Sequence, residues 1–269
     1  MTRFLVVPQW QGSPSARAML LIDGAEAIAG DLPRARSTLV EVPVEAGESL
    51  DTGIRRFSTL QRVQERLREA LAASDEVALV VGGDCGVAVP AIAHAASAHE
   101  QVAVVWFDAH ADHHTPESSA SGAYAGMALR AVWSDGPLGA AALPAERVVL
   151  AGAREFDAAE REVLDDAAVV EVPIEVLADA AAIGDAVART GATSVYIHVD
   201  LDVLDPAELS GVSQALPFGL TLDQVTASIR DVRGRFPLVG ASIAGFAPAT
   251  PAAAVDDLGT ILRIVGALA

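Results

Sequence analysis

The sequence predicts an α/β fold, in which helices cover both faces of a mostly parallel sheet of about eight strands and form a three-layer, doubly wound domain. Two observations support this prediction. Short runs rich in Val and Ile recur along the whole chain, and they largely lack the polar–apolar alternation of a strand with one solvated face. Between these runs lie segments whose apolar residues recur at helical spacing.

The strands are expected at eight short apolar runs, each bounded by polar or glycine-containing segments. Their β-branched content and their lack of alternation are typical of strands that are buried on both faces of a parallel sheet. In chain order, the runs cover residues 3–7, 38–42, 77–81, 102–107, 147–150, 169–172, 194–199 and 238–243.

Helices are expected at residues 16–29, 58–73, 157–166, 222–233 and 255–268. The second of these shows the pattern most clearly, because its leucines and valine form one apolar stripe at residues 60, 63, 67 and 71. No repeat, low-complexity linker or change of composition marks a boundary. We therefore expect residues 1–269 to form a single domain.

The charge balance excludes several classes of function. The chain has 36 acidic and 18 basic residues, every basic residue is Arg, and the net charge is −18. Such a surface argues against nucleic acid or an anionic membrane as a partner. No run reaches the roughly 20 apolar residues of a membrane span. The single cysteine and the lack of a signal-peptide pattern predict a cytoplasmic protein.

Acidic, imidazole and thiol side chains gather where three of the predicted strands end. The strand at 77–81 is followed by Gly-Gly-Asp-Cys, the strand at 102–107 by Asp-Ala-His-Ala-Asp-His-His, and the strand at 194–199 leads into Asp-Leu-Asp. Ligands of α/β proteins bind outside the carboxyl ends of the strands, so these side chains are expected to meet. The eight candidate metal ligands are Cys85, Asp108, His110, Asp112, His114, His198, Asp200 and Asp202.

The alternate spacing within these segments favours a metal site. Residues at i, i+2 and i+4 of an extended segment face the same way, so four aspartates would converge. Buried together without lysine they would repel one another, and bound cations are the usual remedy. Carboxylate and imidazole ligands suit Mn²⁺, with Zn²⁺, Fe²⁺ and Co²⁺ as alternatives. The sequence has no G-x-G-x-x-G, P-loop or G-x-S-x-G motif, so nucleotide binding and serine-hydrolase chemistry lack support.

The three motifs resemble those of the arginase/agmatinase/formiminoglutamase family, the ureohydrolases. That family has a GGDH turn, a DAHxDxN segment and an SxDxD segment followed by LDP, and this chain has GGDC, DAHADHH and HVDLDVLDP in the same order. The variant with Cys in the first motif is similar to relatives that hydrolyse N-hydroxyarginine. The resemblance implies hydrolysis of an amidine or guanidine C–N bond of a small, arginine-like substrate by a metal-bridging hydroxide.

The resemblance also implies two metal ions per chain, normally Mn²⁺, with Zn²⁺ or Fe²⁺ as options at the cysteine. One ion would be held by Cys85, Asp108, Asp112 and Asp200. The other would be held by Asp108, His110, Asp200 and Asp202, so that Asp108 and Asp200 would bridge the two ions.

Further matches suggest where the substrate binds. By resemblance, Asp157 and Glu160 would receive an α-amino group, although Asp157 could instead only cap the helix that follows it. His114 and Ser121 fall in the segment that resembles the carboxylate-binding loop. For proton transfer the candidates are His114 and His198, because the family's shuttle histidine is replaced by Ala125.

Two other departures bear on the substrate and on activity. Cys85 replaces a His ligand, and Gly245 stands where the family has a guanidinium-binding Glu. The loss of this carboxylate would weaken the binding of a less basic group, such as an N-hydroxyguanidine, a formimino group or an amide, less than the binding of a guanidinium ion. Three alternatives stay open: an inactive relative with a binding or structural role, a formimino or amide hydrolase, and deacetylase chemistry on one zinc. The sequence also leaves open whether the chain forms a homo-oligomer.

Overall fold

A computed structural model of the chain describes residues 2–269. All eight predicted strands are present, and each lies within two or three residues of its expected bounds. The strands are β1 (Arg3–Val7), β2 (Ser37–Leu39), β3 (Ala78–Gly82), β4 (Val102–Phe107), β5 (Val148–Ala151), β6 (Val170–Val172), β7 (Ser194–Asp200) and β8 (Leu238–Ala244).

The helices include the five that the sequence predicts and three further ones. The additional helices are rich in Ala, and their short apolar patterns gave a weaker periodic signal. The helices are α1 (Leu20–Gly30), α2 (Phe57–Ala72), α3 (Ala88–Ala98), α4 (Ala128–Trp133), α5 (Ala158–Asp166), α6 (Ala181–Arg189), α7 (Leu222–Arg235) and α8 (Ala254–Leu268). None of the helices described is both long and apolar enough to cross a bilayer.

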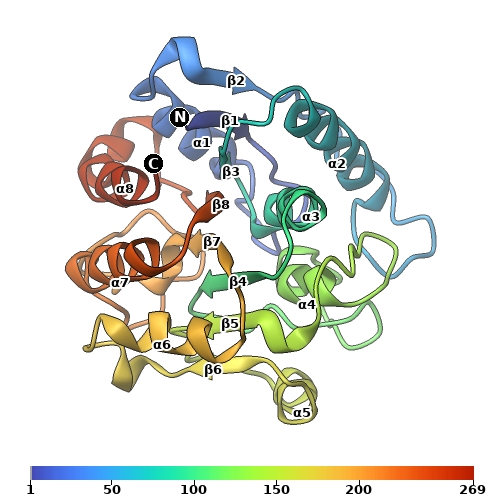
Figure 1. The fold of residues 1–269 in the computed structure, drawn as a ribbon. Helices are drawn as coiled ribbons and strands as arrows, with labels where there is room; N and C mark the ends of the chain where they lie inside the picture. The colour runs from blue at the N-terminus through green and yellow to red at the C-terminus, as the bar shows by residue number, and fades with distance from the viewer. Residues whose placement is uncertain (1) are drawn as a thin grey trace.

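The strands form one parallel sheet in the order β2-β1-β3-β8-β7-β4-β5-β6, and helices cover both of its faces (Figure 1). The helices α1, α6, α7 and α8 lie on one face, and α2, α3, α4 and α5 on the other. Each face has its own apolar core, which is why the strands lack alternation. The predicted three-layer, doubly wound architecture is confirmed.

The strand order brings the predicted ligand segments together. The strands that precede them, β3, β7 and β4, lie in the middle of the sheet, and β8 lies between β3 and β7. Because all of these strands are parallel, their carboxyl ends share one edge of the sheet. Residues that are more than a hundred positions apart in the sequence, such as Cys85 and Asp200, therefore lie side by side.

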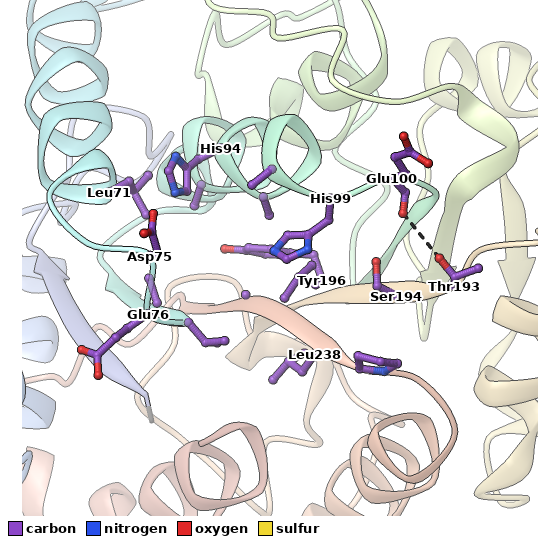
Figure 2. A pocket seen from close by; sticks show the side chains of 18 residues that line it. Leu71, Asp75, Glu76, His94, His99, Glu100, Thr193, Ser194, Tyr196 and Leu238 are labelled. Atoms are coloured by element: carbon purple, nitrogen blue, oxygen red, sulfur yellow. Dashed lines mark hydrogen bonds between the residues drawn. The ribbon is translucent and has the colours of Figure 1, made fainter.

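The opposite edge of the sheet holds a separate cavity of about 730 Å³, at the amino ends of β3, β7 and β8. Figure 2 shows His94 and His99 from the α3 segment above Tyr196 and Leu238. Tyr196 is 1% exposed, and its ring fills the space over Gly240, where a Cβ would lie 2.7 Å from the ring. None of the candidate ligands lines this cavity, so the chemistry predicted from the sequence belongs to the carboxyl edge alone.

Candidate metal centre

The turn after β3 positions Cys85 through the aspartate that precedes it. The Oδ1 of Asp84 accepts hydrogen bonds from Gln9 Nε2 (2.8 Å) and from the Gly86 amide (3.0 Å), and its Oδ2 accepts one from the Gly12 amide (2.9 Å). Burial raises the pKa of Asp84 to about 6. This aspartate caps the short helical turn that begins at Cys85, so the thiol is fixed at the edge of the sheet.

The first cluster of candidate ligands consists of Cys85, Asp108 and Asp200. Their ligand atoms all lie within 4.8 Å of one another, and all three residues are buried. The Cys85 thiol donates to Oδ2 of Asp200 at 2.7 Å. These residues follow or end β3, β4 and β7, three of the four central strands, as the sequence predicts.

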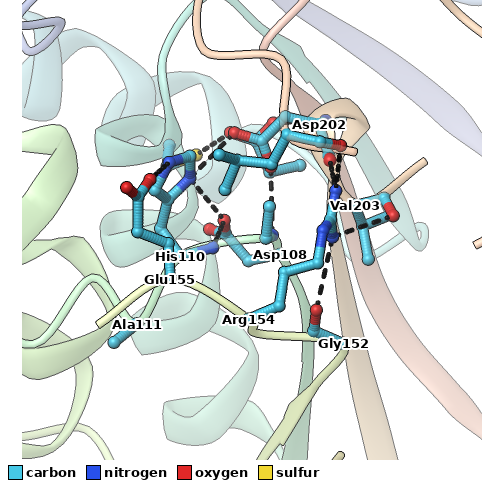
Figure 3. A network of polar contacts seen from close by, with 12 residues as sticks. Asp108, His110, Ala111, Gly152, Arg154, Glu155, Asp202 and Val203 are labelled. Atoms are coloured by element: carbon cyan, nitrogen blue, oxygen red, sulfur yellow. Dashed lines mark hydrogen bonds and ion pairs between the residues drawn. The ribbon is translucent and has the colours of Figure 1, made fainter. Parts of the chain in front are cut away.

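The second cluster shares Asp108 with the first and adds His110 and Asp202, again within 4.8 Å (Figure 3). The Nδ1 of His110 lies 3.0 Å from Oδ2 of Asp202 and 3.4 Å from Oδ1 of Asp108. Asp108 also accepts a hydrogen bond from the Trp106 indole at 2.9 Å, and Asp202 accepts one from the Ala109 amide at 3.1 Å. The two clusters thus lie next to each other and meet at one carboxylate.

Asp112 lies beside the two clusters rather than within them. It is 6% exposed, its backbone is in the left-handed region (φ 53°), and its Oδ2 is buried without a hydrogen-bond partner among the residues described. Burial and the charges of Asp108 and Asp200 raise its pKa well above the usual value. A buried acceptor without a donor is the kind of atom that a cation would satisfy.

The site carries more negative charge than a buried cluster can hold alone. Burial, with the charges of Asp202 and Asp108, raises the pKa of Asp200 well above the usual range. Burial and Asp108 raise that of Asp202 to about 6, and burial and Asp200 raise that of the Cys85 thiol. Cations bound here would reverse these shifts, because they favour the deprotonated form of each ligand.

His110 is the candidate ligand with a strong cationic tendency. Burial alone would lower its pKa, but hydrogen bonds to Asp108 and Asp202 raise it to about 12. The same interaction lowers the pKa of Asp108, although burial opposes it. A proton on this imidazole occupies the position between two carboxylates where a metal ion would fit. The donors present, one thiol, one imidazole and four carboxylates, suit two divalent cations.

Two residues that the sequence did not single out as site residues, Arg154 and Glu155, support the second cluster. Glu155 Oε2 lies 3.3 Å from Nε2 of His110. Figure 3 shows the Arg154 guanidinium beside Asp202, where its Nη2 donates to the backbone carbonyl of Asp202 at 3.0 Å and to that of Leu216 at 2.9 Å. Neither role was visible in the sequence, because both depend on contacts with distant segments.

The residues predicted to bind the substrate's amino group already have partners. The Oδ1 of Asp157 accepts the Glu160 amide at 2.9 Å, and Glu160 Oε2 accepts the Asp157 amide at 3.2 Å. This reciprocal capping box begins α5, so Asp157 caps the helix through Oδ1 and keeps Oδ2 for a second contact. The Nε2 of His114 lies 3.0 Å from Asp157 Oδ2 and 3.9 Å from Glu160 Oε2. The structure therefore brings these three predicted residues together.

The remaining predicted residues, Ser121 and His198, make no hydrogen bond to the candidate ligands among the contacts described. The hydroxyl of Ser121 accepts the Ala123 amide at 3.1 Å within its own loop. His198 is fully buried, with Nδ1 2.7 Å from the Ser242 hydroxyl and its ring centroid 3.9 Å from that of Trp106. Burial lowers the pKa of His198 to about 3, so this imidazole is neutral. Its environment is that of a packed core residue beneath the clusters.

A cavity of about 50 Å³ reaches the ligands, and Ala125 and Gly245 are part of its wall. Gly245 has a φ of +91°, and a Cβ at this position would lie 2.3 Å from Oδ1 of Asp200. The backbone and its neighbour thus leave no room for a side chain at position 245. A carboxylate there would need both Asp200 and the backbone to move.

Comparisons with known proteins agree with this site. The sequence profile described as "Arginase family" matches residues 24–259. An N(omega)-hydroxy-L-arginine amidinohydrolase of Streptomyces lavendulae is 30% identical over 238 residues, which cover 87% of this chain and 76% of that protein. An arginase of Staphylococcus aureus is 29% identical over 67% of this chain, and that match spans 64% of the relative's length.

Solved structures with the same fold extend over nearly the whole chain. The arginase of Entamoeba histolytica superposes with a TM-score of 0.86 at 21% identity, covering 99% of this chain and 97% of that one. A proclavaminate amidino hydrolase of Streptomyces clavuligerus gives a TM-score of 0.75 at 21% identity, over 99% and 91% of the two chains. Together with the profile match and the shared ligand motifs, these similarities show that the chain belongs to the arginase family.

Proposed function

We propose that this protein is a binuclear-metal hydrolase that cleaves a C–N bond of an amidine- or guanidine-type group, and that its substrate is an arginine-like molecule with a weakly basic reacting group, such as N-hydroxyarginine. The observation that carries the proposal is the pair of buried ligand clusters that share Asp108 at the carboxyl edge of the sheet. Every candidate ligand position has a side chain able to bind a divalent cation.

The residues that would hold the metals are those of the two clusters together with Asp112. Manganese is the ion we propose, with Zn²⁺ or Fe²⁺ at the Cys85 position because a thiolate is a softer ligand. When bound, two divalent ions would lower the pKa of a water molecule towards neutrality and stabilise charge that develops on the substrate. The protein's own contribution is a buried, preorganised set of donors.

His114 is the residue we propose for proton transfer to the departing amine. Its ring is partly exposed, contacts Asp157 and lines a cavity that Tyr124 also lines, so it can exchange protons with solvent. His198, the other candidate, is enclosed by Trp106 and Ser242, and its burial favours a supporting role. Asp157 and Glu160 lie against the His114 imidazole, so an amino group of the substrate would compete with this imidazole for the two carboxylates.

The preference for a weakly basic substrate follows from the wall of the small cavity. With glycine at position 245 and alanine at position 125, neither place offers a carboxylate or an imidazole to a guanidinium ion. A charge-assisted hydrogen bond contributes roughly 1.5–3 kcal/mol, so its loss would cost arginine about one to two decades in kcat/KM. For a substrate whose reacting group is neutral near pH 7, the reduction in kcat/KM would be smaller.

Ala125 and Gly245 also favour a second candidate function, in which the protein binds a metal or a ligand without catalysis.

Metal analysis combined with a substrate panel separates the two functions. The protein is reconstituted with Mn²⁺ or Zn²⁺, its metal content is measured, and arginine, N-hydroxyarginine, agmatine and N-formimino-glutamate are assayed by product detection. We expect two ions per chain and at least roughly tenfold faster hydrolysis of N-hydroxyarginine than of arginine.

Fewer than one ion per chain would contradict the metallohydrolase, and two ions without turnover of any substrate would favour the binding role. Equal or faster hydrolysis of arginine would contradict the weakly basic substrate. We further propose a cytoplasmic location, a small amino-acid-like molecule as the partner, and assembly into a homo-oligomer as a property to be tested by light scattering.

A further inference from the structure

The cavity at the ligand clusters has few side chains besides the ligands that can bind a reacting group. Apart from the candidate ligands and Asp84, the polar side chains that line it are Ser13, Ser213 and Gln214. Both oxygens of Asp84 already accept hydrogen bonds, and the Ser13 hydroxyl accepts one from the Ser15 amide at 3.2 Å. The longest polar side chain with access to this cavity is therefore that of Gln214.

Gln214 lies in an exposed segment that is anchored on its amino side by a buried carboxylate. Asp257, 6% exposed in α8, accepts the Gly211 amide at 2.8 Å and the Ser210 amide at 3.1 Å. Gly211 in turn accepts a hydrogen bond from the Ala247 amide at 2.7 Å. An antiparallel bridge then pairs Val212 with Phe246. The segment is thus held against the residue that follows Gly245.

The carboxyl side of the segment is anchored by the same arginine that supports the second cluster. The Arg154 guanidinium donates to the backbone carbonyl of Leu216 at 2.9 Å and to that of Pro217 at 3.2 Å. Gln214 therefore lies in a segment that is anchored on both sides. Among residues 2–269, no side chain or backbone group forms a hydrogen bond with its carboxamide. An exposed loop residue without such anchors would not be positioned for recognition.

We propose that Gln214 determines the specificity for the reacting group, by accepting from an N–H and donating to an oxygen of a neutral hydroxyguanidine, amidoxime or amide. This inference rests on the proposed function and names a residue for the recognition that Gly245 cannot provide. A carboxamide offers one acceptor and one donor side by side. A guanidinium ion has donors only, so it can use only the oxygen of the amide, which carries no negative charge.

The test compares Gln214→Ala and Gln214→Glu with Gln61→Ala, a control at an exposed position of α2. Binding of N-hydroxyguanidine and of guanidinium chloride to the Mn²⁺-loaded protein is measured by calorimetry, and kcat and KM are measured for N-hydroxyarginine and arginine. We expect Gln214→Ala to weaken binding of N-hydroxyguanidine about tenfold and to raise KM with unchanged metal content. Gln214→Glu is expected to shift the selectivity towards guanidinium and arginine by about tenfold.

A second variant tests the loop anchor. Asp257→Ala frees the Ser210 and Gly211 amides, so Gln214 loses its fixed position and the ligand ratio should shift in the same direction as in Gln214→Ala, with the metal content unchanged. If the ratio of the affinities for N-hydroxyguanidine and guanidinium in both Gln214 variants stays within about twofold of that in the Gln61→Ala control, Gln214 does not determine the specificity for the reacting group. If ligand binding depends on Gln214 while no substrate is turned over, the inference stands and the proposed hydrolysis fails.

Discussion

The Cys85 thiol lies 2.7 Å from Oδ2 of Asp200, although 115 positions separate the two residues in the sequence. The contact joins the turn after β3 to the end of β7, across the intervening strand β8. Such a short contact between two potential anions is favourable only with a proton or a cation between them. It is therefore the place where a bound cation would replace the proton of the Cys85 thiol.

Cys85 should be protected from thiol reagents by metal. Because it is the single cysteine of the chain, labelling reports this position alone. A metal-bound thiolate is held by the ion, so reaction with a disulfide reagent should be at least tenfold slower in Mn²⁺- or Zn²⁺-loaded protein than after chelation. Equal rates would show that Cys85 is not a ligand. Cys85→His is expected to raise Mn²⁺ occupancy relative to Zn²⁺, because imidazole is the harder ligand.

Asp108 and Asp202 should differ in how many ions their loss removes. The carboxylate of Asp108 belongs to both clusters, whereas that of Asp202 belongs to the second. Asp108→Asn is therefore expected to abolish binding of both ions, and Asp202→Asn to leave about one per chain. Metal analysis after reconstitution and dialysis measures this directly. Identical stoichiometry in the two variants would mean that Asp108 does not bridge.

Asp112→Asn should change stability in opposite directions with and without metal. The Oδ2 of Asp112 is buried without a partner, so replacing the carboxyl by a neutral amide should raise the free energy of unfolding in EDTA by about 1 kcal/mol. With saturating Mn²⁺ the variant should be less stable than the natural protein, because it binds the ion more weakly. Urea denaturation in both buffers checks the sign, with Asp135→Asn at an exposed loop position as the control. A loss of stability in both buffers would exclude Asp112 as a ligand.

Gly245→Glu should not create an arginase. Gly245 stands where the resemblance places a guanidinium-binding Glu, but a Cβ at this position would lie 2.3 Å from Oδ1 of Asp200. The positive φ of +91° adds backbone strain of about 1–3 kcal/mol. Gly245→Ala and Gly245→Glu should both lower metal content and thermal stability. Full metal content in Gly245→Ala would show that Asp200 can move at low cost.

His114→Ala should lower kcat without loss of metal. General acid–base groups contribute about a hundredfold or more to rate, and His114 is the partly exposed imidazole beside Asp157. We expect a fall of at least that size on N-hydroxyarginine, with the metal content unchanged. His99→Ala, at an exposed imidazole on the opposite edge of the sheet, is the control. A variant with the full kcat would remove His114 from the chemistry.

The sequence by itself determined the sheet, the family and the candidate ligands. Strands that are buried on both faces read as unbroken apolar runs, which is why β4 was located at its observed bounds. Cys85, Asp108 and Asp200 were found because each is adjacent to such a strand end, and in a parallel sheet those ends coincide. Local sequence is sufficient for features that depend on strand position alone.

Only the tertiary structure decided how the side chains share their partners. It showed that one carboxylate oxygen of Asp157 caps α5 and that the other contacts His114. It also showed that Asp112 lies beside the two clusters. It also left no room for a side chain at position 245, and it anchored the segment that contains Gln214 at Gly211 and at Leu216. These outcomes depend on distances between segments that are far apart in the chain. The spacing of residues within one segment does not contain those distances, because they follow from how the strands and loops pack together.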